Sequence, residues 1–280
     1  MNTVLRAIRW LATAPLFRRL TTVTPLVRLS FALRASLVRE HVRFVKNELR
    51  SGPVTAIYRL RESGIAVALR HPRGDVMALD KIFSQGEYEF PAAVERTLAK
   101  VQGPLRVVDL GANVGLFGAW LLGRFPTAQI LAVEADPETA AVHRLTIEAN
   151  GLGDRWQLVE AFAGTRAGTT RFVPGLFGLS HAADEDEGID VPVIDVMPDL
   201  LKADLVKIDI EGAEWQIVDD PRFHELSALV VAFEYHAWGC PADNPRAAAD
   251  QVLRAAGYNV VHDGENPAVE AGVLWGWQPR

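Results

Sequence analysis

Residues 107–115 (VVDLGANVG) constrain the fold of this chain more than any other stretch. A short apolar run ends in an acid, Asp109. A glycine turn follows, and a helical pattern of apolar residues then runs from Val114 to Phe125. This order predicts a strand, a tight turn and a helix N-terminus. Glycine lets the backbone approach a ligand, and a helix N-terminus presents unpaired N–H groups and the positive end of its dipole. We therefore expect a binding site here.

A second strand pattern begins about 20 residues after this turn. It covers residues 129–133 and also ends in an acid, Glu134. In nucleotide-binding α/β folds an acid at this position binds ribose hydroxyls. Its two acceptor oxygens match the two hydroxyls of a cis-diol. Together the two stretches indicate a cofactor with an adenosine part.

The residues of the turn restrict which cofactor this is. A nicotinamide fingerprint, Gly-x-Gly-x-x-Gly, that starts at Gly111 needs glycines at 113 and 116, where the chain has Asn113 and Leu116. The Gly-Lys-Ser/Thr sequence of a P-loop is absent from the chain. Asp109 favours a ligand with a positive group over a pyrophosphate. S-adenosylmethionine carries an ammonium and a sulfonium, so it fits.

The chain resembles the FkbM-type family of S-adenosylmethionine-dependent methyltransferases. Four stretches carry the resemblance, and their order and spacing agree: VVDLGANVG (107–115), AVEADP (132–137), VKIDIEGAEWQIV (206–218) and FEYH (233–236). KIFSQGEYE (81–89) is similar to the lead-in that this family places before its first strand. The resemblance covers roughly residues 75–262 and implies a class I, Rossmann-like fold.

Cofactor contacts are expected at the ends of three strands. The first group, around the methionine end, is Asp109, Gly111, Ala112, Asn113 and Gly115, and Asn113 tolerates the unusual backbone angles of such a turn. Glu134 is expected at the ribose, with Ala135 and Asp136 beside the adenine edge. The resemblance places the adenine also against Glu160, Ala161 and Ala163. Asp209 is expected near the sulfonium.

Catalytic candidates follow the next two strands. Asp209 and Glu211 come after an apolar strand, with Glu214 three residues later, and such crowding of acids is costly unless a cation, a proton or a hydroxyl donor is shared. Glu211 is a candidate base or substrate acceptor, whereas Glu214 is explained equally well as an acid at a helix N-terminus. His236 beside Glu234 is a candidate general base, and His181 is a second one; each is also compatible with a structural role.

Asp209, Glu234 and His236 could together hold a divalent ion. The chain has no His-rich or Cys-rich ligand spacing, so we expect no metal. Tyr88, Tyr235 and Trp238 are candidate pocket aromatics, with packing in the core as the alternative.

Charge is distributed unevenly along the chain. Residues 1–50 hold ten basic and two acidic residues, a net charge of +8, so the whole-chain charge of −6 leaves −14 on residues 51–280. The segment is amphipathic, but it has no uncharged apolar run near the roughly 18 residues that span a bilayer. Three interpretations remain open: helices packed on the catalytic domain or a sister subunit of a homodimer, a helix on an anionic membrane surface, or a targeting peptide.

The remaining pattern predicts an α/β domain. Strands and helices alternate after residue 103, which predicts a doubly wound, mostly parallel seven-stranded sheet with binding at the carboxyl ends of its strands. The expected elements include a helix at 137–150 with Gly151 as its C-cap, and strands at 169–173 and 191–194. We expect a basic helical extension (1–50), a β-cap and lead-in helix (51–102) and the cofactor-binding domain (103–280). The cap pattern is two or three strands at 54–59, 65–69 and 76–79.

The expected activity is O-methylation of a hydroxyl on a small, glycosyl or lipid-linked metabolite. The alternatives are an N-methyltransferase and a catalytically idle S-adenosylmethionine-binding partner subunit. The overall acidity gives no basic footprint for nucleic acid. The single cysteine, Cys240, excludes an internal disulfide and favours a reducing compartment, so we expect a cytoplasmic protein, with peripheral membrane contact through residues 1–50 as an option.

Overall fold

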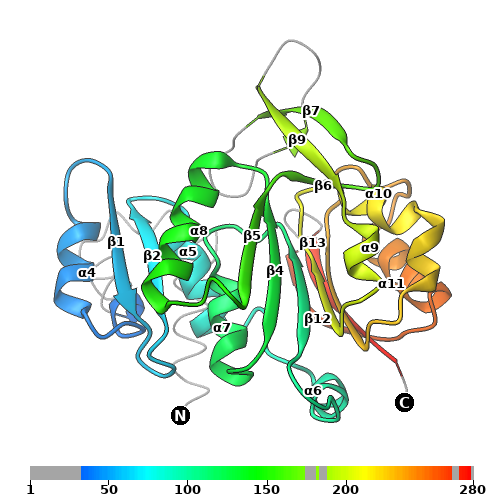
Figure 1. Cartoon of the computed structure of the whole chain (residues 1–280), viewed down its shortest axis with the longest axis horizontal. Helices are drawn as coiled ribbons and strands as arrows, with labels where there is room; N and C mark the ends of the chain where they lie inside the picture. Colours follow the sequence, from blue (N-terminus) through cyan, green and yellow to red (C-terminus); the bar gives the residue numbers. More distant parts are fainter. Residues whose placement is uncertain (1–32, 174–180, 183–187, 267–270, 279–280) are drawn as a thin grey trace.

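A seven-stranded sheet forms the centre of the computed structural model, which describes residues 33–173, 181–182, 188–266 and 271–278 (Figure 1). Its strand order is β12-β13-β11-β10-β3-β4-β5, and all neighbours are parallel except the two pairings of β13. The strands are β3 (Arg106–Leu110), β4 (Gln129–Glu134), β5 (Trp156–Glu160), β10 (Leu205–Ile208), β11 (Val230–Tyr235), β12 (Asn259–Asn266) and β13 (Ala271–Trp277). The predicted doubly wound sheet of seven strands is confirmed.

Each face of the sheet has its own hydrophobic core. Successive strand residues point to opposite faces, so Val107 belongs to one core and Val108 to the other. Helices α6 (Ala92–Leu98), α7 (Leu116–Arg124) and α8 (Pro137–Asn150) contribute to the first core. Helices α9 (Met197–Leu200), α10 (Glu214–Asp219) and α11 (Pro245–Ala255) contribute to the second. Because β11, β10, β3, β4 and β5 are parallel, their carboxyl ends lie at one common edge of the sheet.

The glycine turn lies at this edge and touches the loop after β10. Gly111 and Gly115 have positive φ angles of 73° and 85°, and Asn113 adopts the left-handed region at 49°. A Cβ on Gly111 would lie 1.7 Å from the carbonyl oxygen of Asp209. A side chain cannot fit at Gly111, so the two loops meet backbone to backbone.

The cap and the extension pack against the same core as the sheet. Strands β1 (Val54–Arg59) and β2 (Ala66–His71) match the first two strands expected in the cap, and they pair antiparallel. The third expected strand, 76–79, is wrong, because these residues lie in helix α5 (Asp75–Asp80), which continues into a π-helical turn, η1 (Lys81–Gln85). Within the described part of the extension, helix α4 (His41–Glu48) packs Phe44 against Tyr58 and His71. Residues 1–32 lie outside the described residues.

A second, four-stranded sheet projects above the main sheet in Figure 1. Its order is β6-β9-β7-β8, with β6 (Phe162–Gly164), β7 (Gly168–Val173), β8 (His181–Ala182) and β9 (Ile189–Asp195). The strands expected near 169–173 and 191–194 exist, but they pair with each other instead of entering the main sheet. The loop expected around His181 contains the short strand β8, paired with β7.

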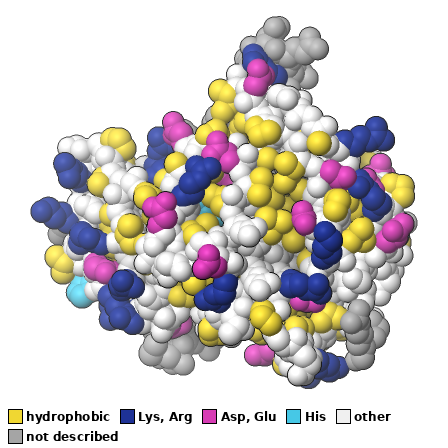
Figure 2. All heavy atoms as spheres, in the orientation of Figure 1, with side chains coloured by type: hydrophobic (Ala, Val, Ile, Leu, Met, Phe, Trp, Pro, Cys, Tyr) yellow, Lys and Arg dark blue, Asp and Glu magenta, His cyan; other side chains and the backbone are white. Residues whose placement is uncertain are grey.

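On the face of the molecule shown in Figure 2, basic and acidic side chains are interspersed. A helix long and apolar enough to cross a membrane is not found among the described residues.

Candidate active site

A cavity of about 270 Å³ opens at the carboxyl edge of the sheet, between the strand ends and the cap. Most of the site residues expected from the sequence line it: Tyr88, Gly111, Ala112, Asn113, Glu134, Ala135, Asp136, Ala161, Ala163, Asp209, Glu211 and Glu234. The cap side contributes residues that the sequence did not single out, chiefly Arg70, Arg73, Asp75, Met77 and Lys81. Asp75 is buried and paired with Arg70 through both carboxylate oxygens. The cap therefore forms one wall of the cavity.

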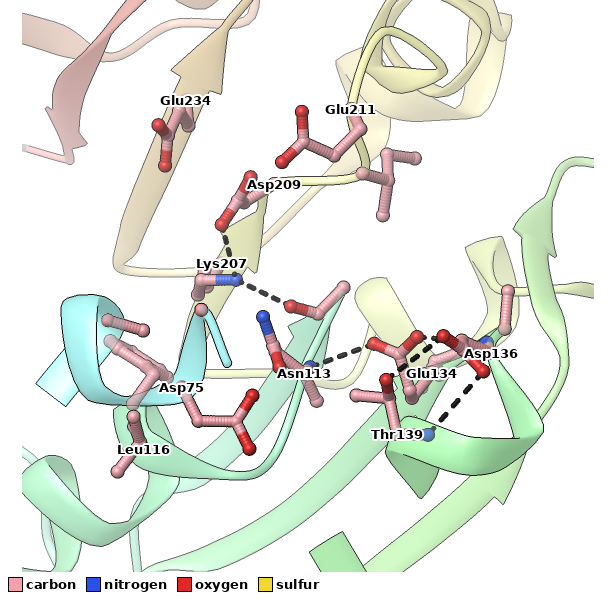
Figure 3. A pocket seen from close by; sticks show the side chains of 18 of the residues that line it. Asp75, Asn113, Leu116, Glu134, Asp136, Thr139, Lys207, Asp209, Glu211 and Glu234 are labelled. Atoms are coloured by element: carbon pink, nitrogen blue, oxygen red, sulfur yellow. Dashed lines mark hydrogen bonds and ion pairs between the residues drawn. The ribbon is translucent and has the colours of Figure 1, made fainter. Parts of the chain in front are cut away.

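Glu134 joins the glycine turn to the end of β4. Its Oε2 accepts a hydrogen bond from the Asn113 backbone N–H at 2.8 Å, and its Oε1 accepts one from the Asp136 N–H at 2.9 Å (Figure 3). Burial raises the pKa of Glu134 to about 7, although these two backbone donors lower it. A carboxylate oxygen can accept more than one hydrogen bond, so Glu134 remains able to accept hydrogen bonds from hydroxyl groups of a ligand in the cavity.

The neighbouring wall is largely apolar, as an adenine ring requires. Ala135 and Ala161 line the cavity, together with Phe162 and Ala163. Asp136 also lines it while capping α8, where its side chain accepts from the Glu138 N–H and the Thr139 hydroxyl.

Glu160 is not brought to the cavity. Its carboxylate pairs with Arg144 of α8 and does not line the cavity. The expected contact through this side chain is corrected, because the last residue of β5 points toward α8. The backbone just beyond, at Ala161, reaches the cavity instead.

Lys207 is the main residue that sequence reasoning missed. Its ammonium is 3.2 Å from Asp109 Oδ1 and donates to the carbonyl oxygens of Leu110 and Gly111. It also lies 3.2 Å from Asp209 Oδ2 (Figure 3). The side chain is 3% exposed. A buried lysine is stable only when its charge is paired, and here it ties the glycine turn to the end of β10. A lysine two residues before Asp209 in an apolar strand was the available sequence signal.

Asp109 and Gly115 lie near the cavity but do not line it. Asp109 is fully buried, and burial raises its pKa, with Lys207 acting in the opposite direction. It does not line the cavity, so Lys207 stands between its carboxylate and any ligand. Gly115 begins α7, and its position leaves no room for a Cβ beside His143.

Acidic side chains gather at the opposite end of the cavity from Glu134. Asp209, Glu211 and Glu234 all line it, and Figure 3 shows them together on one wall. The Tyr88 hydroxyl donates to Asp209 at 3.2 Å or to Glu234 at 3.1 Å. This confirms that Tyr88 lies in the pocket, whereas Tyr235 is buried in the core.

These acids have displaced pKa values. Burial and the charge of Asp209 raise the pKa of Glu211 to about 8 and the pKa of Glu234 well above its usual range. Burial also acts to raise the pKa of Asp209, but Lys207 and His236 lower it overall. Asp209 therefore carries the most firmly held negative charge of this wall.

His236 is not placed as a neutral base. Its Nδ1 is 3.1 Å from Glu214 Oε1, and its Nε2 is 3.6 Å from Glu211 Oε2. Burial lowers the pKa of His236, but the hydrogen bond to Glu214 and the nearby carboxylates raise it to about 10. An imidazolium has no lone pair to accept a proton, so this environment disfavours His236 as the general base. The role of His236 in catalysis stays a prediction.

Glu214 fixes the loop after β10. It is fully buried, and its two oxygens accept from the Ile210 and Gly212 N–H groups at 2.8 and 2.7 Å. It is therefore more than an acid at a helix N-terminus. The second candidate base, His181, lies in β8 of the four-stranded sheet. Its side chain lies outside the described residues. Trp238 is half exposed and packs over Gly212 without lining the cavity.

The sheet order, the glycine turn and Glu134 at the end of the second strand define a class I methyltransferase fold with a nucleoside site. A family model described as "Methyltransferase FkbM domain" matches residues 109–260, which is more than half of the chain. The chain belongs to this family, and S-adenosylmethionine is its cofactor.

The chain is also similar to proteins of known name. The chain is 27% identical to "Methyltransferase sdnD" of Sordaria araneosa, over 56% of this chain and 74% of that protein. It is 23% identical to "Methyltransferase 1" of Beauveria bassiana, over 55% of this chain and 72% of that protein. Among solved structures, it is similar to M. jannaschii TYW2 in complex with AdoMet, with a TM-score of 0.44 and 17% identity over 81% of this chain and 87% of the other.

Proposed function

We propose that this methyltransferase transfers the methyl group to a hydroxyl oxygen of a small, glycosyl or lipid-linked metabolite. The observation that supports this is the wall formed by Asp209, Glu211 and Glu234 at the far end of the cavity from Glu134. An alcohol needs its proton removed as it attacks, and carboxylates are suitable proton acceptors.

The reaction is an in-line displacement. The acceptor oxygen forms a bond to the methyl carbon while the bond from that carbon to sulfur breaks, and the electron pair of that bond stays on sulfur. The products are a methyl ether and S-adenosylhomocysteine, and the hydroxyl proton passes to a carboxylate of the wall. Holding the three atoms in line supplies much of the rate.

Glu211 is the carboxylate that we assign as proton acceptor, because its raised pKa of about 8 makes its ionised form a stronger base than an ordinary carboxylate. It lines the cavity, its side chain is 36% exposed, and its backbone is held at a φ of 54°, a left-handed conformation that non-glycine residues adopt rarely. Asp209 is committed to Lys207, and Glu234 shares Tyr88 with Asp209. Glu211 is therefore the most accessible of the three.

The cofactor arm of the test is calorimetric titration of the purified protein with S-adenosylhomocysteine. Glu134→Ala should weaken binding about tenfold to a hundredfold, because one or two hydrogen bonds to ribose are lost, each worth about 1–2 kcal/mol. Arg171→Ala, in a surface pair with Asp190, is the control and should leave binding unchanged. Absence of binding by the wild type would contradict the cofactor assignment.

The acceptor arm is a screen with radiolabelled S-adenosylmethionine and hydroxylated or amino acceptors. Glu211→Gln keeps the shape of the side chain but removes its basicity, so it should lower kcat at least a hundredfold on an alcohol while KM for the cofactor stays the same. An amine acceptor that loses no rate in Glu211→Gln would favour the N-methyltransferase. Cofactor binding without turnover on any acceptor class would favour the idle subunit.

We also propose that residues 1–50, with their charge of +8, bring the enzyme to an anionic membrane that carries the acceptor. The test is co-sedimentation with vesicles that contain anionic lipid, at low and high salt. Binding that disappears in neutral vesicles or at high salt supports the proposal. Equal recovery in the supernatant with and without vesicles contradicts it.

A further inference from the structure

We propose that Asp209, Glu234 and His236 bind one divalent metal ion, of the Mn²⁺ or Mg²⁺ class, at the acceptor end of the cavity. The inference rests on the proposed function, and it names how the acceptor hydroxyl is held. It departs from the expectation drawn from sequence, where the ligand spacing gave no indication of a metal. The three residues are 25 and two positions apart along the chain, and only the fold brings them together.

The spacing of the three ligand atoms is that of a coordination shell. One atom from each residue can be chosen so that all lie within 4.8 Å of one another. Ligands at about 2.0–2.3 Å from a metal are about 3 to 4.6 Å apart. Asp209 follows β10, and Glu234 lies in the adjacent parallel strand β11, with His236 directly after it. All three side chains are half-buried, so an ion can reach them from the cavity.

His236 is oriented by a residue outside the proposed ligand set. Glu214 is fully buried and fixed by the Ile210 and Gly212 N–H groups, and its Oε1 is 3.1 Å from His236 Nδ1. The ring is thus held through Nδ1, and Nε2 is the nitrogen turned toward the acidic wall, 3.6 Å from Glu211. A metal-binding histidine is commonly held by a carboxylate at its other nitrogen in this way.

The charges and donor atoms of the wall suit a hard divalent ion. The Lys207 ammonium contacts Asp109 and two backbone carbonyl oxygens as well as Asp209, so it neutralises the charge of Asp209 only in part. Tyr88 contacts Asp209 Oδ2 and Glu234 Oε2, and each carboxylate has a second oxygen. Carboxylate oxygens favour Mg²⁺ or Mn²⁺, and one imidazole is compatible with Mn²⁺.

Three protein ligands leave coordination positions for the acceptor. A hydroxyl bound to the ion loses its proton more readily, and that proton passes to Glu211 as its oxygen attacks the methyl carbon. A second position on the ion accommodates a neighbouring oxygen of the same molecule. The site therefore favours acceptors with two adjacent oxygens, such as a vicinal diol or an α-hydroxy carbonyl.

The experiment is a Mn²⁺ titration of the full chain, treated with EDTA, dialysed and saturated with S-adenosylhomocysteine, with free Mn²⁺ measured by electron paramagnetic resonance. The wild type should bind one Mn²⁺ per chain. Glu234→Gln and His236→Gln should each raise the Kd for Mn²⁺ at least tenfold. The matched control is Asp250→Asn, which changes another histidine–carboxylate pair, where His262 Nε2 is 3.3 Å from Asp250 Oδ1. The Kd of this variant for Mn²⁺ should stay within twofold of the wild-type value.

A second measurement does not depend on any variant being stable. Pulsed paramagnetic resonance of the Mn²⁺ complex should show ¹⁴N coupling from a directly bound imidazole in the wild type and in Asp250→Asn. Absence of Mn²⁺ binding, binding that neither ligand variant changes, or a wild-type complex without ¹⁴N coupling would each overturn the proposal. S-adenosylhomocysteine binding in EDTA separates the two ideas: if it persists while Mn²⁺ fails to bind, only the metal site is refuted.

Discussion

Glu134 makes cofactor binding depend on pH at the scale of a single residue. Its pKa in the free protein is raised to about 7, chiefly by burial. In the expected complex, ribose hydroxyls donate to the ionised Glu134 carboxylate, so protonation of this group would compete with binding. The Kd of S-adenosylhomocysteine should rise about tenfold for each pH unit below 7. Calorimetry from pH 8 to pH 5 checks this, with Glu134→Gln as the control that binds weakly and with little pH dependence. A wild-type Kd as flat as that of the variant would contradict it.

Single residues also show what the sequence could not predict. Strand ends identified Glu134, Asp209 and Glu211 correctly as cavity residues, because the carboxyl ends of parallel strands meet at one edge. The raised pKa of His236 could not be predicted from the sequence, because it depends on the contact with Glu214, 22 positions earlier in the chain. A pKa reflects burial and neighbours in space, and neither follows from local sequence.

Helix α7 is locked onto β5 by a contact that has no space for a methyl group. A Cβ on Gly118 would lie 2.3 Å from the buried ring of Trp156. Gly118→Ala should therefore lower the free energy of unfolding by about 1–3 kcal/mol, despite the gain of roughly 1 kcal/mol in helix propensity. Urea denaturation measures this. Gly153→Ala, where a Cβ meets nothing within 4 Å, should leave stability unchanged or slightly raised. Equal stability of the two variants would refute the contact.

Elements were predicted well where their pattern is long and poorly where it is short. The pattern of α8 gave Pro137–Asn150 with its C-cap at Gly151, as observed, because a capping acid, a proline and a glycine mark its ends. The run at 76–79 is too short to distinguish a strand from a helical turn. Strands β7 and β9 were located, but their separate sheet was not, because strand partners are chosen by contacts distant in sequence.

At the scale of the whole molecule, one core joins parts that the sequence divided. The expected boundary near residue 50 follows a change in charge, and the one near residue 102 follows the start of the alternating strands and helices. In the structure, Phe44 of the extension, Leu69 of the cap and Leu116 of the cofactor-binding domain lie in a single cluster of buried residues. The cap is thus stabilised by the sheet that it covers. Alternating strands and helices predict the fold class, but they do not show which segments share a core.

The pH dependence of global stability should report on that shared core through His143. This residue is fully buried, packed edge-on against Trp156 at 5.1 Å and close against Gly115. Burial, aided by the charge of Arg144, lowers its pKa to about 4, while the Asn113 backbone acts in the opposite direction. The unfolded chain binds this proton near pH 6.5 and the folded chain only near pH 4. Stability from His143 is therefore present above pH 6.5 and is lost as the pH falls toward 4.

The expected loss is about 3 kcal/mol over that interval, since one pKa unit corresponds to about 1.4 kcal/mol. Buried acids with raised pKa values, such as Glu134, change stability in the opposite sense, so the wild-type curve alone does not isolate the histidine. The difference between the wild type and His143→Gln does, because the other groups titrate in both proteins. Urea denaturation at intervals from pH 7.5 to 4.5 should show a wild-type loss that the variant lacks. Parallel curves, or an NMR titration of His143 in the folded protein with a pKa near 6.5, would contradict the prediction.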